Sequence, residues 1–304
     1  MSNILVLGGS SFDRIAYVVK NPCVYGTVNA HHYIESPGSS GTAKAMALSR
    51  LGEIVHFHTV LGEDEAGDKI RAALKASQVN VSYDKDPTGT NRKIRIIDDS
   101  GNKLSIHLPN FDNPIALSRN VLTDLMARCD LIVLNLVGYN RDILDLVAAS
   151  GRPVWCDLHD YLENDPYYDA FIAVSDYIFL NSDRLTDYRD TMKALGSKGR
   201  LIVCTHGKEG STAFCKDKFY EQSAYDFVPV DTTGAGDSYF SGFLSEYLKK
   251  GNIERSLMYA SIAGGLSIET RDTVDKFLSH DLVEKTLLQK GIFDKSNPQG
   301  STNF

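Results

Sequence analysis

The chain has 304 residues, of which 42% are hydrophobic and 23% charged, proportions that are ordinary for a globular protein with one large or two small domains. Its formal net charge of -7 disfavours a general nucleic-acid binder, because such proteins usually carry a basic face. No stretch approaches the ~18 consecutive apolar residues of a membrane span. We therefore expect a cytoplasmic protein with neither nucleic-acid nor membrane partners.

Short, apolar, β-rich runs alternate with helical patterns along the chain. The strands are expected at residues 3–9, 55–62, 130–137, 153–158, 177–181 and 200–207. The helices are expected at residues 42–51, 64–76, 117–128, 140–150 and 183–195. This alternation predicts a parallel sheet with helices on both faces.

Two segments break this alternation. Residues 24–36 and 91–111 alternate polar and apolar side chains, and the second contains the hairpin signal Asp98-Asp99-Ser100-Gly101-Asn102. We interpret them as a small second sheet that forms a lid over a substrate. The lid segments, at about 13–40 and 88–111, would belong to a single α/β domain of residues 1–293, and residues 294–304 read as a polar tail.

The first strand ends in Gly8-Gly9, but the G-x-G-x-x-G pattern of a dinucleotide site is absent. A glycine turn is therefore favoured, and a nicotinamide-dependent oxidoreductase is disfavoured. Asp13 lies just past this strand, at the edge where open α/β sheets bind ligands. Residues 36–52 form a Gly/Ser-rich loop that opens a helix, for which Thr42 is a candidate cap.

The sequence THGKEG, at residues 205–210, ends a strand and by itself is typical of a plain β-turn. About one hairpin length separates it from a second glycine loop, which would bring both loops to one edge of the sheet. The histidines show no metal-binding spacing, and Cys129, Cys156 and Cys204 read as reduced core cysteines.

The stretch DTTGAGDSYFSGFL, at residues 231–244, is the most specific pattern. Its glycine loop opens into a helix with an apolar face, and a helix N-terminus favours an anion. Asp237 is either a capping residue, contributing ~1 kcal/mol, or a general base that takes a proton from a hydroxyl. The glycine loop in front of it favours the base, because a cap needs only the aspartate. The amides of Gly234, Ala235 and Gly236 would then stabilise charge on a transferred phosphoryl group.

Taken in order, these motifs resemble those of the ribokinase or PfkB-type family of carbohydrate and nucleoside kinases. The likeness covers about residues 3 to 275, and its most specific part is the near position-by-position match of residues 231–244 to the C-terminal signature of the family. The other similar stretches are residues 36–52, 60–70, 87–102 and 205–210. The resemblance implies a three-layer α/β/α fold with a mostly parallel central sheet and a small β-sheet lid.

The resemblance also implies an ATP-dependent transfer of a phosphoryl group to a hydroxyl, expected to be primary, of a small sugar, sugar derivative or nucleoside. Asp237 would be the base, and Gly234, Ala235 and Gly236 would form the anion hole. Mg²⁺ would bind the ATP phosphates, and a monovalent cation is a further possible cofactor. The exposed edge of the lid could pair with a second copy, giving a homodimer. The implied acceptor residues are Asp13, Gly38, Ser39, Ser40 and Gly41; the nucleotide residues are Asn181, Thr205, Gly207, Gly210 and Thr233; and Asp183 is the indirect metal residue.

The chain departs from the family pattern at several positions. Ser39 replaces a glycine and Ala43 an asparagine that binds the sugar, so the acceptor is left open. Arg184 stands where the family has a glutamate, and Asp157 is kept from an Asp-x-Asn-x-Arg motif whose arginine is absent. These changes favour the alternative of a binding protein that has lost turnover and senses a sugar or nucleoside, whereas the intact residues 232–237 favour the kinase.

Overall fold

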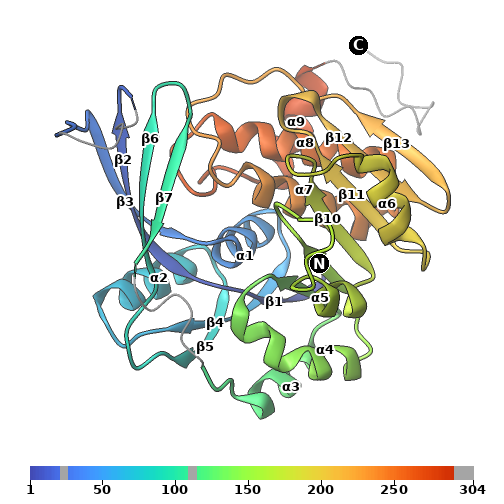
Figure 1. Ribbon diagram of the computed structural model, residues 1–304, viewed down its shortest axis with the longest axis horizontal. Coiled ribbons are helices and arrows are strands. Elements are labelled where there is room, and N and C mark those ends of the chain that lie inside the picture. The colour runs from blue at the N-terminus through green and yellow to red at the C-terminus, as the bar shows by residue number, and fades with distance from the viewer. Residues whose placement is uncertain (21–26, 109–114, 291–304) are drawn as a thin grey trace.

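The computed structural model describes residues 1–20, 27–108 and 115–290. A nine-stranded sheet in the order β13-β12-β11-β10-β9-β8-β1-β4-β5 forms its centre (Figure 1). Each pair of neighbouring strands from β11 to β5 is parallel. β12 pairs antiparallel with β11, and β13 pairs antiparallel with β12. The strands are β1 (Asn3–Leu7), β4 (Ile54–Leu61), β5 (Asn80–Lys85), β8 (Leu131–Asn135), β9 (Val154–Asp157), β10 (Tyr177–Asn181), β11 (Leu201–Thr205), β12 (Ser211–Cys215) and β13 (Lys218–Gln222).

Helices cover both faces of this sheet, as the alternation predicts. Ile4 and Val6 of β1 pack in one core with α1, α2, α7, α8 and α9, and Leu5 and Leu7 pack in a second core with α3, η1, α4, α5 and α6. A central parallel strand is thus buried on both faces. The helices are α1 (Ser40–Arg50), α2 (Glu65–Ala76), α3 (Arg119–Arg128), η1 (Gly138–Ile143), α4 (Leu144–Ala149), α5 (Asp169–Val174), α6 (Tyr188–Gly196), η2 (Gly207–Glu209), α7 (Ala235–Lys250), α8 (Ile253–Ile268) and α9 (His280–Gln289).

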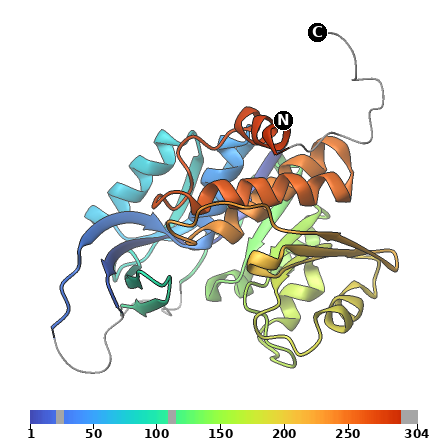
Figure 2. The same cartoon turned by 90° about the horizontal axis from the view of Figure 1, so that it is seen from above.

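A four-stranded small sheet stands beside the main sheet (Figures 1 and 2). Its order is β3-β2-β6-β7, in which β2 pairs antiparallel with β3 and parallel with β6, and β6 and β7 form a hairpin. Its strands are β2 (Ser11–Val18), β3 (His32–Gly38), β6 (Arg92–Asp98) and β7 (Lys103–His107). Since β2 follows β1 after only a short glycine turn, one continuous segment joins the two sheets.

The three-layer fold and its small sheet are confirmed, but several elements differ from the expected ones. β2 overlaps the expected lid segment 13–40 but precedes the alternating run 24–36, and β3 occupies the end of that run and extends to Gly38. The helix expected at 183–195 begins only at Tyr188, after an Asp187 cap. The β12–β13 hairpin occupies the interval of about one hairpin length between the two glycine loops, whereas α5, α8, α9 and β5 have no counterpart among the expected elements. The expected tail at 294–304 and parts of both lid segments lie outside the described residues.

The three cysteines expected in the core, Cys129, Cys156 and Cys204, are buried and free. Within the described residues, no helix combines the length and apolarity needed to cross a membrane.

Candidate active site

The glycine loop before α7 makes a sharp turn into the helix. Gly234 is the N-cap, with φ 79°, and a Cβ at this position would overlap the carbonyl oxygen of Thr273. Only glycine satisfies both conditions. The N–H groups of the first helical turn have no acceptors within the helix, although Ala235 N donates to Thr232 O at 3.4 Å. Gly236 therefore offers the freer amide of the two.

Asp237 lies in the first turn of α7 but does not cap it. The N-cap position belongs to Gly234, and no side chain closes it, so the capping alternative is wrong. The Asp237 carboxylate turns instead toward α1, where its Oδ1 accepts hydrogen bonds from Ser40 Oγ and, at 2.6 Å, from Lys44 Nζ. These contacts join the N-termini of α1 and α7, which are remote in the sequence.

Lys44 is wholly buried, and its ammonium group meets three oxygen atoms. Its Nζ lies 2.5 Å from Ser40 Oγ, 2.6 Å from Asp237 Oδ1 and 2.8 Å from Asp157 Oδ2. Burial disfavours the charge, but Asp157 and Asp237 outweigh it and raise the pKa of Lys44. For Asp157, burial is likewise outweighed, here by His159 and Lys44, which lower its pKa.

Asp13 lies on β2, not beyond a strand, and its carboxylate is 1% exposed. Its Oδ1 accepts a hydrogen bond of 2.6 Å from Ser11 Oγ. Its Oδ2 lies 2.9 Å from Arg95 Nη2, but the geometry is not that of a hydrogen bond, and this oxygen accepts none from the residues that the structure describes. A Cβ on Gly38 would overlap the carboxylate, so glycine is required for this close approach.

Ser39, which stands in place of the glycine of the family, has φ 76° and ψ 147°, a conformation that is nearly exclusive to glycine. The loop keeps the backbone shape of a glycine motif at the cost of strain.

The face of the small sheet that carries Asp13 also carries three basic side chains, Lys93, Arg95 and Lys103. Register places Lys93 beside Asp13, and Arg95 and Lys103 follow on the same face. Burial lowers the pKa of Lys93, and Asp13 and Asp237 oppose that shift, so its ammonium faces the same space as the Asp237 carboxylate.

Contacts with Asp231 fasten the small sheet to the glycine loop. Tyr17 of β2 donates to its Oδ2 at 2.7 Å, Thr233 N donates to its Oδ1 at 2.8 Å, and Lys103 Nζ lies 3.5 Å away. Lys103 also donates to Thr233 Oγ1 at 3.0 Å. Thr233, expected at the nucleotide, thus faces the small sheet.

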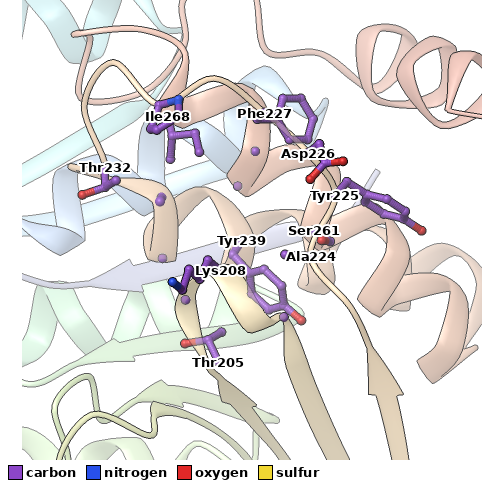
Figure 3. A pocket seen from close by; sticks show the side chains of 17 residues that line it. Thr205, Lys208, Ala224, Tyr225, Asp226, Phe227, Thr232, Tyr239, Ser261 and Ile268 are labelled. Atoms are coloured by element: carbon purple, nitrogen blue, oxygen red, sulfur yellow. The ribbon is translucent and has the colours of Figure 1, made fainter. Parts of the chain in front are cut away.

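Behind the glycine loop lies a cavity of about 430 Å³. Figure 3 shows Phe227 and Ile268 on one side of it and Thr205 and Lys208 on the other. Gly207 and Gly210 of the THGKEG loop line it together with Ala235 and Gly236. The β12–β13 hairpin therefore brings the two glycine loops to one cavity, and Gly236 faces this cavity while its neighbour Asp237 contacts α1.

The structure does not bring Asn181 and Asp183 to this cavity. Asn181 ends β10 and donates to Asp160 Oδ1 at 2.5 Å, and Asp183 N donates to Asn181 Oδ1 at 3.2 Å. Asp183 is exposed and lines a separate hollow with His206 and Glu209.

Among the described residues, Glu246, His280 and Glu284 bring ligand-type atoms within 4.8 Å of one another. Arg255 donates to both carboxylates, at 2.7 Å and 2.5 Å, so an internal cation already stands between them. We assign this cluster to the packing of α7, α8 and α9.

Sequence reasoning missed Lys44, Lys93 and Tyr17 at the site. Lys44 left one usable signal, a lysine within the otherwise small and apolar run of residues 43–48. A buried position on that helix predicts a partner for the charge, but not which partner.

Comparison with known proteins assigns the chain to a protein family, through matches that cover most of its length. The family model described as pfkB family carbohydrate kinase matches residues 1–279. The chain is similar to acarbose 7(IV)-phosphotransferase of Actinoplanes sp., with 29% identity over 281 residues that cover 86% of this chain and 91% of that one. It is also similar to ribokinase of Bacillus subtilis, with 26% identity over 302 residues that cover 92% and 100% of the two chains.

Solved structures show the same fold. The microbiome-derived acarbose kinase Mak1 superposes with a TM-score of 0.84 at 24% identity, covering 95% of this chain and 99% of that one. A ribokinase of Arabidopsis thaliana complexed with ribose and ATP gives 0.77 at 19% identity, covering 94% and 98%.

Proposed function

Because the chain belongs to the pfkB family of carbohydrate kinases, and is thus a sugar or nucleoside kinase, we propose that it transfers the γ-phosphoryl group of ATP to a hydroxyl, expected to be primary, of a small sugar, sugar derivative or nucleoside. One observation carries the proposal. Two adjacent residues face opposite sides: Gly236 lines the cavity beside the nucleotide loop, and Asp237 contacts the acceptor loop through Ser40.

In this proposal the acceptor lies between Asp237 and the small sheet. Asp13, whose Oδ2 accepts no hydrogen bond, and the loop of residues 38–41 hold its hydroxyls. Asp237 takes the proton of the attacking hydroxyl while the hydroxyl oxygen bonds to the γ-phosphorus and the bond from that phosphorus to the β,γ-bridging oxygen breaks, so that ADP leaves. The Gly236 amide, with the loop from Gly234, stabilises the charge that develops on the phosphoryl oxygens. The small sheet excludes water as a lid.

ATP would occupy the cavity, with Thr205, Gly207 and Gly210 beside it and Phe227 offering an aromatic face. The carboxylate of Asp183 and the amide oxygen of Asn181 are the hard oxygen donors that Mg²⁺ prefers. Asp183 lines a separate hollow rather than this cavity, so the proposal gives these residues only an indirect contact with the metal, through water. Bound Mg²⁺ would neutralise charge on the phosphates.

The test is ADP release from Mg-ATP with a panel of acceptors. We would include acarbose, ribose, deoxyribose, ribose 1-phosphate, fructoselysine and common nucleosides, because relatives are named for several of them. Turnover with one acceptor, reduced by about 10²-fold or more in Asp237→Asn, is expected. Retained turnover in the variant would exclude Asp237 as the base.

The alternative of a sensor without turnover predicts a different result. Such a protein would bind ATP or an acceptor, detected as a rise in melting temperature, and release no ADP with any acceptor. A homodimer through the small sheet is a further part of the proposal, supported by the exposed Leu104 and Ile106 on β7 and tested by sedimentation.

A further inference from the structure

The proposed chemistry assigns no role to the charged side chain of Lys44. Its side chain is 0% exposed, and its three ammonium protons match three oxygen atoms, those of Ser40, Asp157 and Asp237. A lysine is rarely buried in this way unless its charge is paired. Here it is doubly paired, at 2.6 Å to Asp237 and 2.8 Å to Asp157.

The contacts leave the two oxygens of Asp237 in different situations. Both Lys44 and Ser40 bind Oδ1. The described part of the chain supplies no hydrogen bond to Oδ2, and the side chain is 17% exposed. One oxygen is therefore fixed by the protein, while the other is left for the acceptor.

Two carboxylates that share one ammonium group also compete for it. Asp157 has further support from His159, whose backbone N–H donates at 3.0 Å and whose Nδ1 lies 3.2 Å away. Lys93, paired with Asp13 on the small sheet, interacts electrostatically with Asp237, and buried Cys156 precedes Asp157 on β9. Without Lys44, both carboxylates would lose the buried cation that they share, and Oδ1 of Asp237 would keep only its contact with Ser40.

We propose that Lys44 is a positioning residue for phosphoryl transfer, which fixes Oδ1 of Asp237 and thereby aims its Oδ2 at the acceptor hydroxyl, with Asp157 as the second carboxylate that fixes the ammonium. This inference rests on the proposed function. Lys44 keeps its own proton throughout, and the proton of the acceptor goes to Asp237.

The test is the kcat and the KM of each substrate, measured with Mg-ATP and whichever acceptor of the panel gives the highest turnover. In Lys44→Met, kcat should fall by at least about tenfold, because Asp237 loses the contact that aims its Oδ2, while the KM for ATP should be little changed. Lys193→Met, which removes an exposed lysine paired with Asp190, is the control and should leave both values unchanged.

Asp157→Asn gives an independent test with an isosteric side chain. Because the ammonium then loses its second carboxylate, kcat should fall, again with the KM for ATP little changed. The double variant Lys44→Met/Asp157→Asn should be little worse than Lys44→Met, since Asp157 acts on Asp237 only through Lys44. Losses in kcat that simply multiply would mean that the two residues act independently, as a purely structural role predicts.

The outcomes separate the two proposals. No turnover with any acceptor would overturn the proposed function. Turnover that Asp237→Asn abolishes, with kcat unchanged in Lys44→Met and Asp157→Asn, would overturn the role of Lys44 alone. If Lys44→Met does not fold, as judged by circular dichroism, Asp157→Asn still decides, because an unchanged kcat contradicts the proposal.

Discussion

The hydroxyl group of Tyr17 on β2 donates a hydrogen bond of 2.7 Å to Asp231, which lies 214 residues further along the chain. This contact ties the small sheet to the loop that opens α7. Burial and Asp231 raise the pKa of Tyr17 well above its usual value, so the phenol keeps its proton and remains the donor. The position of the small sheet is thus coupled to the loop beside the proposed base.

Tyr17→Phe should weaken acceptor binding and leave nucleotide binding unchanged. Loss of a hydrogen bond to a buried carboxylate costs about 1.5 to 3 kcal/mol, and we expect the KM for the acceptor to rise by about tenfold or more. Steady-state kinetics with each substrate varied in turn would measure this. Tyr33→Phe, which removes the hydroxyl of an exposed tyrosine on β3, is the control. An equal rise in the KM for ATP would argue against a lid.

Gly265→Ala should weaken nucleotide binding. A Cβ at Gly265 on α8 would overlap the ring of Phe227, which lines the cavity, and the ring would have to move. Such overpacking costs about 1 to 3 kcal/mol, so the Kd for ADP should rise by roughly tenfold, as measured by calorimetry. In the control Gly138→Ala, the added Cβ meets no atom within 4 Å. Unchanged affinity in Gly265→Ala would mean that Phe227 does not contact the nucleotide.

His58 should make the stability of the fold fall in mild acid. It is 2% exposed on β4, and burial lowers its pKa from 6.5 despite Asp84 at 3.2 Å. The unfolded chain therefore binds a proton below about pH 6.5 that the folded chain resists. The stability due to the neutral imidazole is complete above that pH and is lost as the pH falls.

Melting temperatures between about pH 5 and 8 test this effect. His58→Gln should show a shallower fall below about pH 6.5 than the wild type. A fall as steep in the variant as in the wild type would assign it to other groups.

Local patterns predicted the elements whose own residues decide their structure. The six expected parallel strands are present because each is an apolar run buried on both faces. The helix α8 was missed because Gly264 and Gly265 are typical of a loop. Its stability comes instead from packing on α7, where Gly242 approaches Ala260 and Ala263 closely. The strand β2, which precedes the expected run 24–36, is likewise held by its two neighbours, β3 and β6, which no local pattern reveals.

At the site, the glycine loop and Asp237 were predicted because a single short motif contains them. Lys44 could not be assigned a partner, because Asp237 lies 193 residues away and the contact exists only once α1 and α7 pack together. Ser39 was recognised as a departure from the family, but its unusual backbone conformation becomes visible only in the structure.

The two faces of the first turn of α7 also meet residues from different parts of the chain. Apart from Asp237, every residue proposed to touch the acceptor comes from the first 111 residues. Every residue that lines the cavity proposed for ATP comes from Thr205 onward. Exchange of the N-terminal third between relatives would therefore transplant acceptor preference while the donor half stays intact. The fold lends itself to diversification by recombination, with a crossover between the two halves rather than within either site.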